Sequence, residues 1–230
     1  MLKLQNVTVE YPDKTKAVDG VSFTLNDNES AALIGENGAG KTTLLLAVVG
    51  ILELSAGGVE ANGVRLAAKS VNEIRKQVGL VFQNPDDQLF TPRIYDDVAF
   101  GCRHIGLPES EVQARVDETL TRLKIAGLRD RPPIKLSAGE KRMAAIAAVL
   151  AMNPSILMLD EPTAFLDPKA KRTLSETLNN LRHPKIIATH DIAFAKEVCN
   201  RVIVLKNGRI AADGPPPLLD DAVFLRECGL

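Results

Sequence analysis

The chain has 230 residues, of which 45% are hydrophobic and 25% are charged, and its 28 Lys and Arg residues nearly balance its 29 Asp and Glu residues. This length can bury a large core and allows one domain, with or without a subdomain. The balanced charge excludes the basic surface that attracts nucleic acid, so we expect no nucleic-acid partner.

The first part of the chain predicts an antiparallel pair of strands and then a buried strand. Residues 2–10 and 18–25 have strand character, and the segment 12–15 between them has the composition of a turn. The apolar run 30–34 predicts the buried strand, and residues 43–50 predict a helix. A glycine-rich segment separates that strand from that helix.

This glycine-rich segment, residues 35–43, reads G-E-N-G-A-G-K-T-T. Its glycines allow backbone conformations that bring successive N–H groups close to a polyphosphate. Lys41 supplies a positive charge for the terminal phosphates, Thr42 can place its hydroxyl on Mg²⁺, and the helix that follows adds its positive dipole end. The alternative is a turn without a ligand, but the complete spacing favours a nucleotide site. The expected nucleotide-binding residues of this segment are Gly35, Glu36, Asn37, Gly38, Ala39, Gly40, Lys41, Thr42 and Thr43.

The rest of the chain predicts a mostly parallel sheet with a helical insertion. Strands are expected at 78–82, 156–159, 185–189 and 201–205, with helical stretches between them, and ligands of such sheets bind at the carboxyl ends of the strands. Between residues 96 and 151 apolar residues recur at helical spacing, as at Val112, Val116 and Leu120. We therefore expect a single α/β domain over residues 1–230, with a helical subdomain at about 84–152. A short hairpin is expected at 208–214.

Two further clusters suggest chemistry. Asp160 and Glu161 follow a buried run, and alternation along a strand would let one carboxylate hold Mg²⁺ while the other reaches a water molecule. Capping of the next helix is the alternative for these acids. Ser137 and Glu140 form the S-x-x-E pattern of a capping box, and a helix that begins with serine and glycine can also bind an anion.

Taken together, these motifs resemble the ATP-binding subunits of ABC transporters along essentially the whole chain. The resemblance implies a P-loop α/β fold, ATP hydrolysis and Mg²⁺ held by Thr42, Gln83 and Asp160. By the same resemblance, residues 35–42 are the Walker A loop, residues 136–140 the signature segment and residues 156–160 the Walker B strand, while single residues match as follows: Gln83 the Q-loop glutamine, Glu161 the catalytic glutamate, Asp167 the D-loop, His190 the switch histidine and Tyr11 the aromatic that stacks on adenine.

The resemblance also implies a dimer, homodimeric or pseudo-symmetric, because the signature segment of one ABC subunit covers the ATP of the other. The residues that would act on the partner's ATP are Ser137, Ala138, Gly139 and Glu140. This segment reads L-S-A-G-E where the family usually has L-S-G-G-Q, but the Ser137 hydroxyl and the Gly139 N–H remain available as donors. Phe165 occupies a D-loop position that is commonly small.

The segments 83–90 (Q-N-P-D-D-Q-L-F) and 95–101 (Y-D-D-V-A-F-G) resemble the ATPases of energy-coupling factor (ECF) importers, particularly those for cobalt and nickel. The resemblance implies an integral membrane coupling subunit, a substrate-specificity subunit and a place at the cytoplasmic face of the membrane. An acidic solvated turn at 85–88 is the alternative for the first segment. Two alternative functions remain open. The chain could serve an importer of a vitamin or another small solute, or it could be a soluble ABC ATPase without a transport role.

Cysteine usage and hydropathy support a cytoplasmic location. Cys102, Cys199 and Cys228 show no disulfide or metal spacing and indicate buried thiols in a reducing compartment. The start of the chain has no secretory signal, and the longest apolar helical stretch, 143–152, is far shorter than the ~20 residues of a membrane span.

Overall fold

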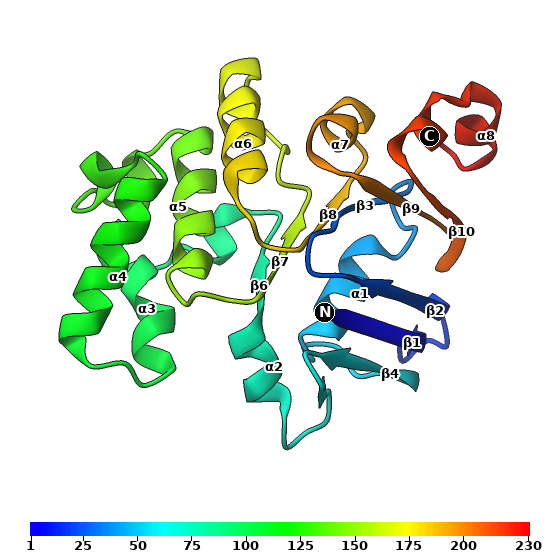
Figure 1. Cartoon of the computed structure of the whole chain (residues 1–230), viewed down its shortest axis with the longest axis horizontal. Helices are drawn as coiled ribbons and strands as arrows, with labels where there is room; N and C mark the ends of the chain where they lie inside the picture. The colour runs from blue at the N-terminus through cyan, green and yellow to red at the C-terminus, as the bar shows by residue number, and fades with distance from the viewer. The chain divides into compact units, whose positions relative to one another are not determined.

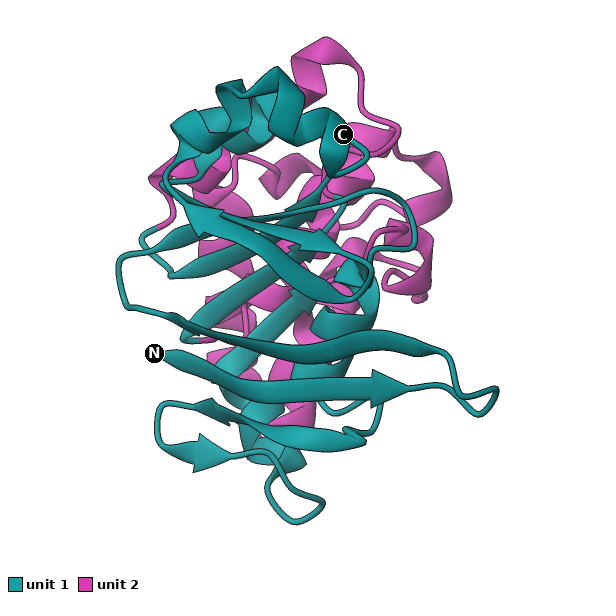
Figure 2. Cartoon of the chain, turned by 90° about the vertical axis from the view of Figure 1, so that its right-hand side faces the viewer, with its two compact units in different colours: residues 1–80, 155–161, 182–230 teal, residues 81–154, 162–181 magenta.

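The computed structural model describes every residue from Met1 to Leu230, and the chain divides into two compact units (Figure 2). Unit 1 comprises Met1–Leu80, Ser155–Glu161 and Arg182–Leu230, and unit 2 comprises Val81–Pro154 and Pro162–Leu181. The chain therefore passes from unit 2 back into unit 1 for the short segment that ends at Glu161, and it enters unit 2 again at Pro162.

The first sheet of unit 1 is antiparallel. Its strands lie in the order β2 (Lys16–Leu25), β1 (Leu2–Glu10), β4 (Ala56–Ala61) and β5 (Val64–Arg65), and β1, β2 and β4 lie side by side in Figure 1. The predicted pairing of the first two strands is confirmed, whereas β4 and β5 were not predicted from the sequence. Two glycines in β4 lower its strand propensity.

The second sheet has six strands, in the order β10 (Arg209–Gly214), β9 (Arg201–Lys206), β3 (Ser30–Ile34), β8 (Lys185–Thr189), β7 (Ile156–Asp160) and β6 (Val78–Val81). The strand β3 pairs in parallel with β8 and β9, and β7 pairs in parallel with β8, while β10 returns antiparallel to β9. The predicted mostly parallel α/β sheet is confirmed. Because β3, β7 and β8 run the same way, their carboxyl ends lie at one edge.

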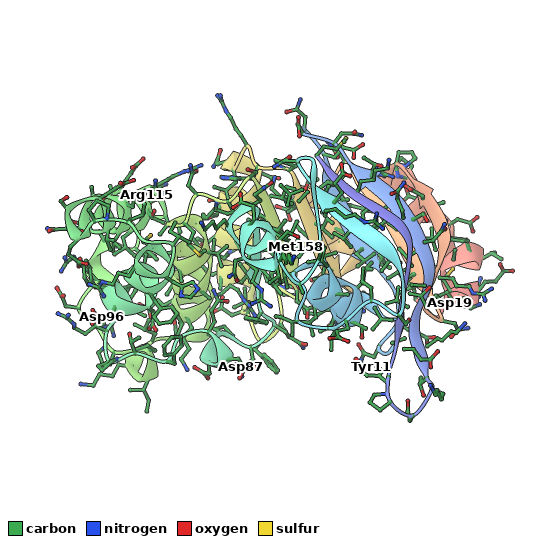
Figure 3. The ribbon with its side chains drawn as sticks, turned by 90° about the horizontal axis from the view of Figure 1, so that it is seen from below. Tyr11, Asp19, Asp87, Asp96, Arg115 and Met158 are labelled. Carbon is green, nitrogen blue, oxygen red and sulfur yellow. The ribbon has the colours of Figure 1, made fainter.

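The helices of unit 1 are α1 (Lys41–Val48), α2 (Val71–Gln77), α7 (Ile192–Val198) and α8 (Ala222–Glu227), with a 3₁₀ turn at Pro216–Asp220. The helix α1 contacts β7, and the core of this unit includes Leu33, Leu44 and Met158, which are almost completely buried, and Met158 is labelled in Figure 3. Burial of such side chains contributes roughly 1.5–3 kcal/mol each. This core holds β3 and α1, and therefore the loop between them, in place.

Unit 2 contains α3 (Ile94–His104), α4 (Glu109–Arg122), α5 (Ala138–Leu150) and α6 (Pro168–Asn180), with short 3₁₀ turns at Pro85–Asp87, Ala126–Leu128 and Pro133–Lys135. The helices α3, α4 and α5 pack against one another. Val112, Val116 and Leu120 are buried on α4, as their helical spacing predicts. None of the helices in the chain combines the length and hydrophobicity that a bilayer-spanning segment requires.

The three cysteines are free and buried. Burial raises the pKa of the Cys199 thiol to about 11 and also raises that of Cys102. These thiols therefore stay protonated at neutral pH and are poor nucleophiles, since the thiolate is the reactive form.

Candidate functional site

The loop between β3 and α1 can be built only with glycine at two of its positions. A Cβ atom on Gly35 would lie 2.5 Å from the carbonyl oxygen of Leu205, and one on Gly40 would lie 2.2 Å from that of Ala17. Gly40 also has a φ of 101°, which side chains with a Cβ avoid. Close backbone packing beneath the loop therefore fixes its course.

The loop leads into α1 without a side-chain cap. Gly40 is the N-cap residue, and neither a capping side chain nor an acidic residue occupies the first turn. The first N–H groups of a helix have no partner within it, and its N-terminal end carries a partial positive charge. Glu36, Asn37, Gly38 and Thr42 are exposed beside this helix start. The segment thus has the physical properties of an anion site.

Lys41 is buried at the foot of the loop. Its side chain is 6% exposed, and its Nζ atom donates to the carbonyl oxygens of Gly35 at 2.7 Å and Glu36 at 3.2 Å. The same Nζ atom lies 3.5 Å from Oε1 of Glu161, whose side chain is 8% exposed. A buried ammonium needs such acceptors, because desolvation without them costs several kcal/mol.

Asp160 is the last residue of β7, and Glu161 follows it with a φ of 41°. Its N–H donates to the carbonyl oxygen of Ala188 at 2.8 Å. The expected strand alternation of the two carboxylates therefore does not apply, because Glu161 lies beyond the strand in a left-handed conformation. Such a conformation costs a non-glycine residue on the order of 1–3 kcal/mol and is concentrated at functional sites.

His190 follows β8 and meets the same glutamate. Its Nδ1 atom lies 2.9 Å from Oε2 of Glu161, and its side chain is 63% exposed. Glu161 therefore presents one oxygen to buried Lys41 and the other to exposed His190. Oε1 of Glu161 is buried and accepts no hydrogen bond, and the Lys41 ammonium lies 3.5 Å from it.

Tyr11 lies at the turn after β1 (Figure 3), and its hydroxyl is 3.1 Å from the hydroxyl of Thr43 in α1. The ring is 39% exposed, so an aromatic base can reach it. Of the predicted nucleotide-binding residues, Ala39 is buried, and its main chain accepts a hydrogen bond from the N–H of Gly208 at 3.1 Å. Unit 1 thus brings together the loop, Tyr11, Asp160, Glu161 and His190.

The signature segment begins α5 in unit 2. Ser137 is the N-cap: its Oγ accepts from the N–H of Glu140 at 3.3 Å, and its own N–H donates to Oε2 of Glu140 at 2.8 Å. This hydrogen bond from Ser137 is the main cause that lowers the pKa of the Glu140 carboxyl. The predicted capping box is therefore formed, and Glu140 stays ionised to help hold it.

The two small residues of the signature have different structural roles. Ala138 is the first residue of α5, where helical geometry suits alanine, so a glycine is not needed there. A Cβ on Gly139 would approach the Cβ of Ala170 in α6 to 2.9 Å. Glycine at this position is therefore required by the packing of α5 against α6.

Asp167, which the resemblance assigns to the D-loop, is the N-cap of α6, and its Oδ1 accepts from the N–H of Ala170 at 2.8 Å. Phe165 is 85% exposed and has a φ of 63°. Nothing in the structure explains why an aromatic residue occupies this strained, exposed position.

Gln83 lies in unit 2, in the exposed segment after β6, and the sequence did not indicate what holds it there. The carbonyl oxygens of Phe82 and Gln83 accept hydrogen bonds from Arg142 at 2.7 and 2.6 Å. Arg142 is 1% exposed within α5. In the sequence, the one sign that Arg142 has a structural role is its position as a charged residue immediately before the apolar run of a buried helix.

The comparisons with known proteins agree with this arrangement. Residues 18–164 match the family model described as ABC transporter. The chain belongs to the ABC transporter family. An energy-coupling factor transporter ATP-binding protein, EcfA of Carboxydothermus hydrogenoformans, is 44% identical over 232 aligned residues that cover 100% of this chain and 86% of that protein.

Two solved structures share the fold of this ABC domain. The structure of cbiO1 from Clostridium perfringens, described as part of the ABC transporter complex cbiONQ, has a TM-score of 0.85 and 39% identity and covers 98% of this chain and 93% of its own. The ATP-binding cassette MJ0796, in a dimeric post-hydrolysis state bound to ADP and Pi, has a TM-score of 0.82 and 26% identity over 94% of this chain and 99% of its own. The chain is therefore the ATP-hydrolysing, ATP-binding subunit of an ECF-type ABC transporter.

The environment of Lys41 predicts the effect of removing its ammonium. Lys41→Ala deletes the cation at the helix start and leaves the buried Glu161 without its charged neighbour. We expect ATP affinity to fall by on the order of tenfold to a hundredfold, the loss expected for a charge-assisted hydrogen bond. Equilibrium titration with a fluorescent ATP analogue measures the change, with Lys69→Ala, at an exposed lysine, as the control. Wild-type affinity in a folded Lys41→Ala protein would contradict the phosphate-site interpretation.

Proposed function

We propose that this ABC subunit hydrolyses ATP at composite sites between two ATPase subunits and thereby powers an importer of cobalt or nickel ions. The observation that carries the hydrolytic part is the arrangement of Glu161 between Lys41 and His190 at the carboxyl ends of β7 and β8. The resemblance of segments 83–90 and 95–101 to the cobalt and nickel ECF ATPases supports the assignment to metal-ion import, and the similarity to cbiO1, part of the ABC transporter complex cbiONQ, supports a subunit of an ABC transporter. No residue of this chain is assigned to the ion itself, which a separate membrane subunit would select.

The loop residues would bind the phosphates. The N–H groups of residues 35–40 and the start of α1 supply fixed donors, and Lys41 can exchange its carbonyl acceptors for phosphate oxygens. The Tyr11 ring would stack on the adenine. Thr42, Asp160 and Gln83 would hold Mg²⁺, which neutralises charge on the phosphates and usually binds through one or two side chains together with the nucleotide.

Glu161 would orient the attacking water and take up its proton, since phosphoryl transfer depends on positioning and on stabilising charge. The other oxygen of its carboxylate lies at His190, which keeps the side chain aimed. When ATP draws Lys41 away, Oε1 of Glu161 becomes the free acceptor for the water. His190 would then donate to the γ-phosphate as its negative charge shifts.

Two subunits would complete each site. Ser137, Ala138, Gly139 and Glu140 of one copy would lie over the ATP of the other, with the first N–H groups of α5 and the Ser137 hydroxyl as donors. A two-fold pair then encloses two ATP molecules, and Asp167 lies at the contact. Binding of ATP closes the pair and hydrolysis opens it.

Glu161→Gln tests the catalytic assignment. The amide keeps the shape of the side chain but removes the base, so we expect unchanged ATP binding, turnover lowered by about 10²–10⁴-fold and accumulation of an ATP-bound dimer. Phosphate release and size-exclusion chromatography measure these effects, with Glu53→Gln, at an exposed glutamate, as the matched control. A Glu161→Gln protein with near wild-type turnover would refute the assignment.

Ser137→Arg tests the composite site. The longer, charged side chain would obstruct the facing phosphates, so we expect ATP binding by the monomer to persist while ATP-dependent dimerisation and hydrolysis are lost. Ser137→Ala is the control, because it loses the same cap, at a cost of about 0.5–2 kcal/mol, without added bulk. Thermal midpoints are measured for both variants. If Ser137→Arg dimerised and hydrolysed ATP normally, the signature would have no role on the partner's ATP.

The docking of the membrane partner is proposed for the segment after Gln83. Asp87 lies there (Figure 3), Phe90 is 63% exposed and Phe100 is 52% exposed, and the two rings meet edge-on at 5.1 Å. Leu89 is only 5% exposed, so it belongs to the core and is unsuited to docking. Exposed aromatic residues are enriched at the centres of protein interfaces, and polar residues such as Asp87 belong to the rim around them.

Asp87→Ala combined with Phe90→Ala tests this docking surface. Neither side chain is assigned to ATP, so basal hydrolysis should be unchanged, while copurification with the membrane subunit from detergent extracts and metal-ion uptake should fall by at least about tenfold, as expected for a binding hot spot. Glu118→Ala with Ile51→Ala, at exposed positions elsewhere, is the control. Uptake and copurification at wild-type levels in the folded double variant would exclude this surface.

A further inference from the structure

A set of contacts inside unit 2 fastens the segment after β6 to the signature helix α5. Nη1 and Nη2 of Arg142 donate to the carbonyl oxygens of Phe82 and Gln83 at 2.7 and 2.6 Å. Nε2 of Gln88 donates to the carbonyl oxygen of Ala145 at 2.8 Å, and its Oε1 accepts from the N–H of Phe82 at 3.3 Å. The segment is thus bound to α5 at both of its ends.

The strengths of these contacts are unequal. Lys141 also reaches the segment, through an ion pair with Asp86 at 2.6 Å, but the Asp86 side chain is 59% exposed. Exposed ion pairs contribute only about 0–1 kcal/mol. Arg142 is 1% exposed, and its planar guanidinium binds two adjacent carbonyl oxygens through charge-assisted bonds, which are the stronger kind. Arg142 therefore contributes more to the fastening than Lys141 does.

From this geometry we propose that Arg142 is a positioning residue that makes the Gln83 loop and the signature turn move as one body. Arg142 lies in the second turn of α5, whose first turn carries Ser137 and Glu140 of the capping box. A shift of the Phe82–Gln83 backbone therefore displaces the helix end that bears the signature. The proposal rests on the proposed function, in which Gln83 serves the ATP of its own subunit and Ser137 serves that of the partner.

The residues that follow Gln88 are held in turn by α3. Oδ1 of Asp97 in α3 accepts from the N–H groups of Phe90 and Thr91 at 3.0 and 2.9 Å. Residues 82–91, which include the exposed Phe90, are therefore held by α5 at their start and by α3 at their end. A displacement of Phe90 by a partner would therefore reach α5 through the bonds that Gln88 and Arg142 make.

Arg142→Met tests the fastening directly, with Lys141→Met as the matched control on the same helix. Methionine keeps an unbranched stem but cannot donate to the two carbonyl oxygens. We expect amide hydrogen exchange in residues 82–88 to accelerate by about tenfold or more in Arg142→Met and by less than about threefold in Lys141→Met, as expected for local opening of the segment. Equal exchange in the two variants would overturn the proposal.

The second readout is catalytic. Arg142→Met leaves the loop between β3 and α1 in unit 1 unchanged. It should therefore keep the KM for ATP within about threefold while kcat falls by about 10²-fold, the loss expected for misplaced groups. Arg142→Lys retains a donor and should recover part of kcat and of the exchange protection, and it serves as the test if Arg142→Met does not fold. Wild-type kcat in either folded variant despite faster exchange, or a fall in both kcat and ATP affinity, would overturn the positioning role. Failure of the proposed function is distinguishable from failure of this proposal. Normal turnover in Glu161→Gln would refute the proposed function, whereas the hydrogen-exchange difference between Arg142→Met and Lys141→Met would remain.

Discussion

The burial of one ammonium group, that of Lys41, is the constraint on which the site depends. A charge that is 6% exposed must be surrounded by acceptors, and here these are the carbonyl oxygens of Gly35 and Glu36 and the carboxylate of Glu161. Gly35 and Gly40 are needed because a Cβ atom at either position would collide with a neighbouring backbone carbonyl oxygen. Glu161 follows β7 in a left-handed conformation, and its carboxylate lies 3.5 Å from the Lys41 ammonium. Loop, lysine and glutamate are therefore one electrostatic unit.

This arrangement connects stability with catalysis. The ion pair between Lys41 and Glu161 stabilises two buried charges, and phosphates would compete with the glutamate for the lysine. ATP binding would thus change the partners of Glu161, the residue that is proposed to activate water. His190 is exposed and approaches the other carboxylate oxygen, so Glu161 stays oriented during the exchange. In the proposed mechanism, a glutamate held in this way would act only after the nucleotide has bound the lysine.

Much of the fold and of the site could be predicted from the sequence. The parallel strands and the glycine-rich loop of residues 35–43 could be predicted because apolar runs end in glycine-rich or acidic segments. Both features depend on residues that are close in the sequence. The strands β4 and β5 were missed because two glycines interrupt the first of them, although the turn Asn62–Gly63, with φ values of 46° and 84°, carries the hairpin signal. Arg142 and the conformation of Glu161 could not be predicted, because they depend on contacts between segments that are distant in the sequence. Leu89 and Phe90 show the same limit, since only packing decides which of the two neighbours is buried.

A crystal structure of the chain with Mg²⁺ and a non-hydrolysable ATP analogue tests the central claim most directly. The account predicts that Nζ of Lys41 leaves Glu161 and binds phosphate oxygens at about 2.7–2.9 Å, the range for charge-assisted bonds, while Oε1 of Glu161 accepts a hydrogen bond from a water molecule facing the γ-phosphate. A structure in which Lys41 stays paired with Glu161 while the phosphates bind elsewhere would contradict the account.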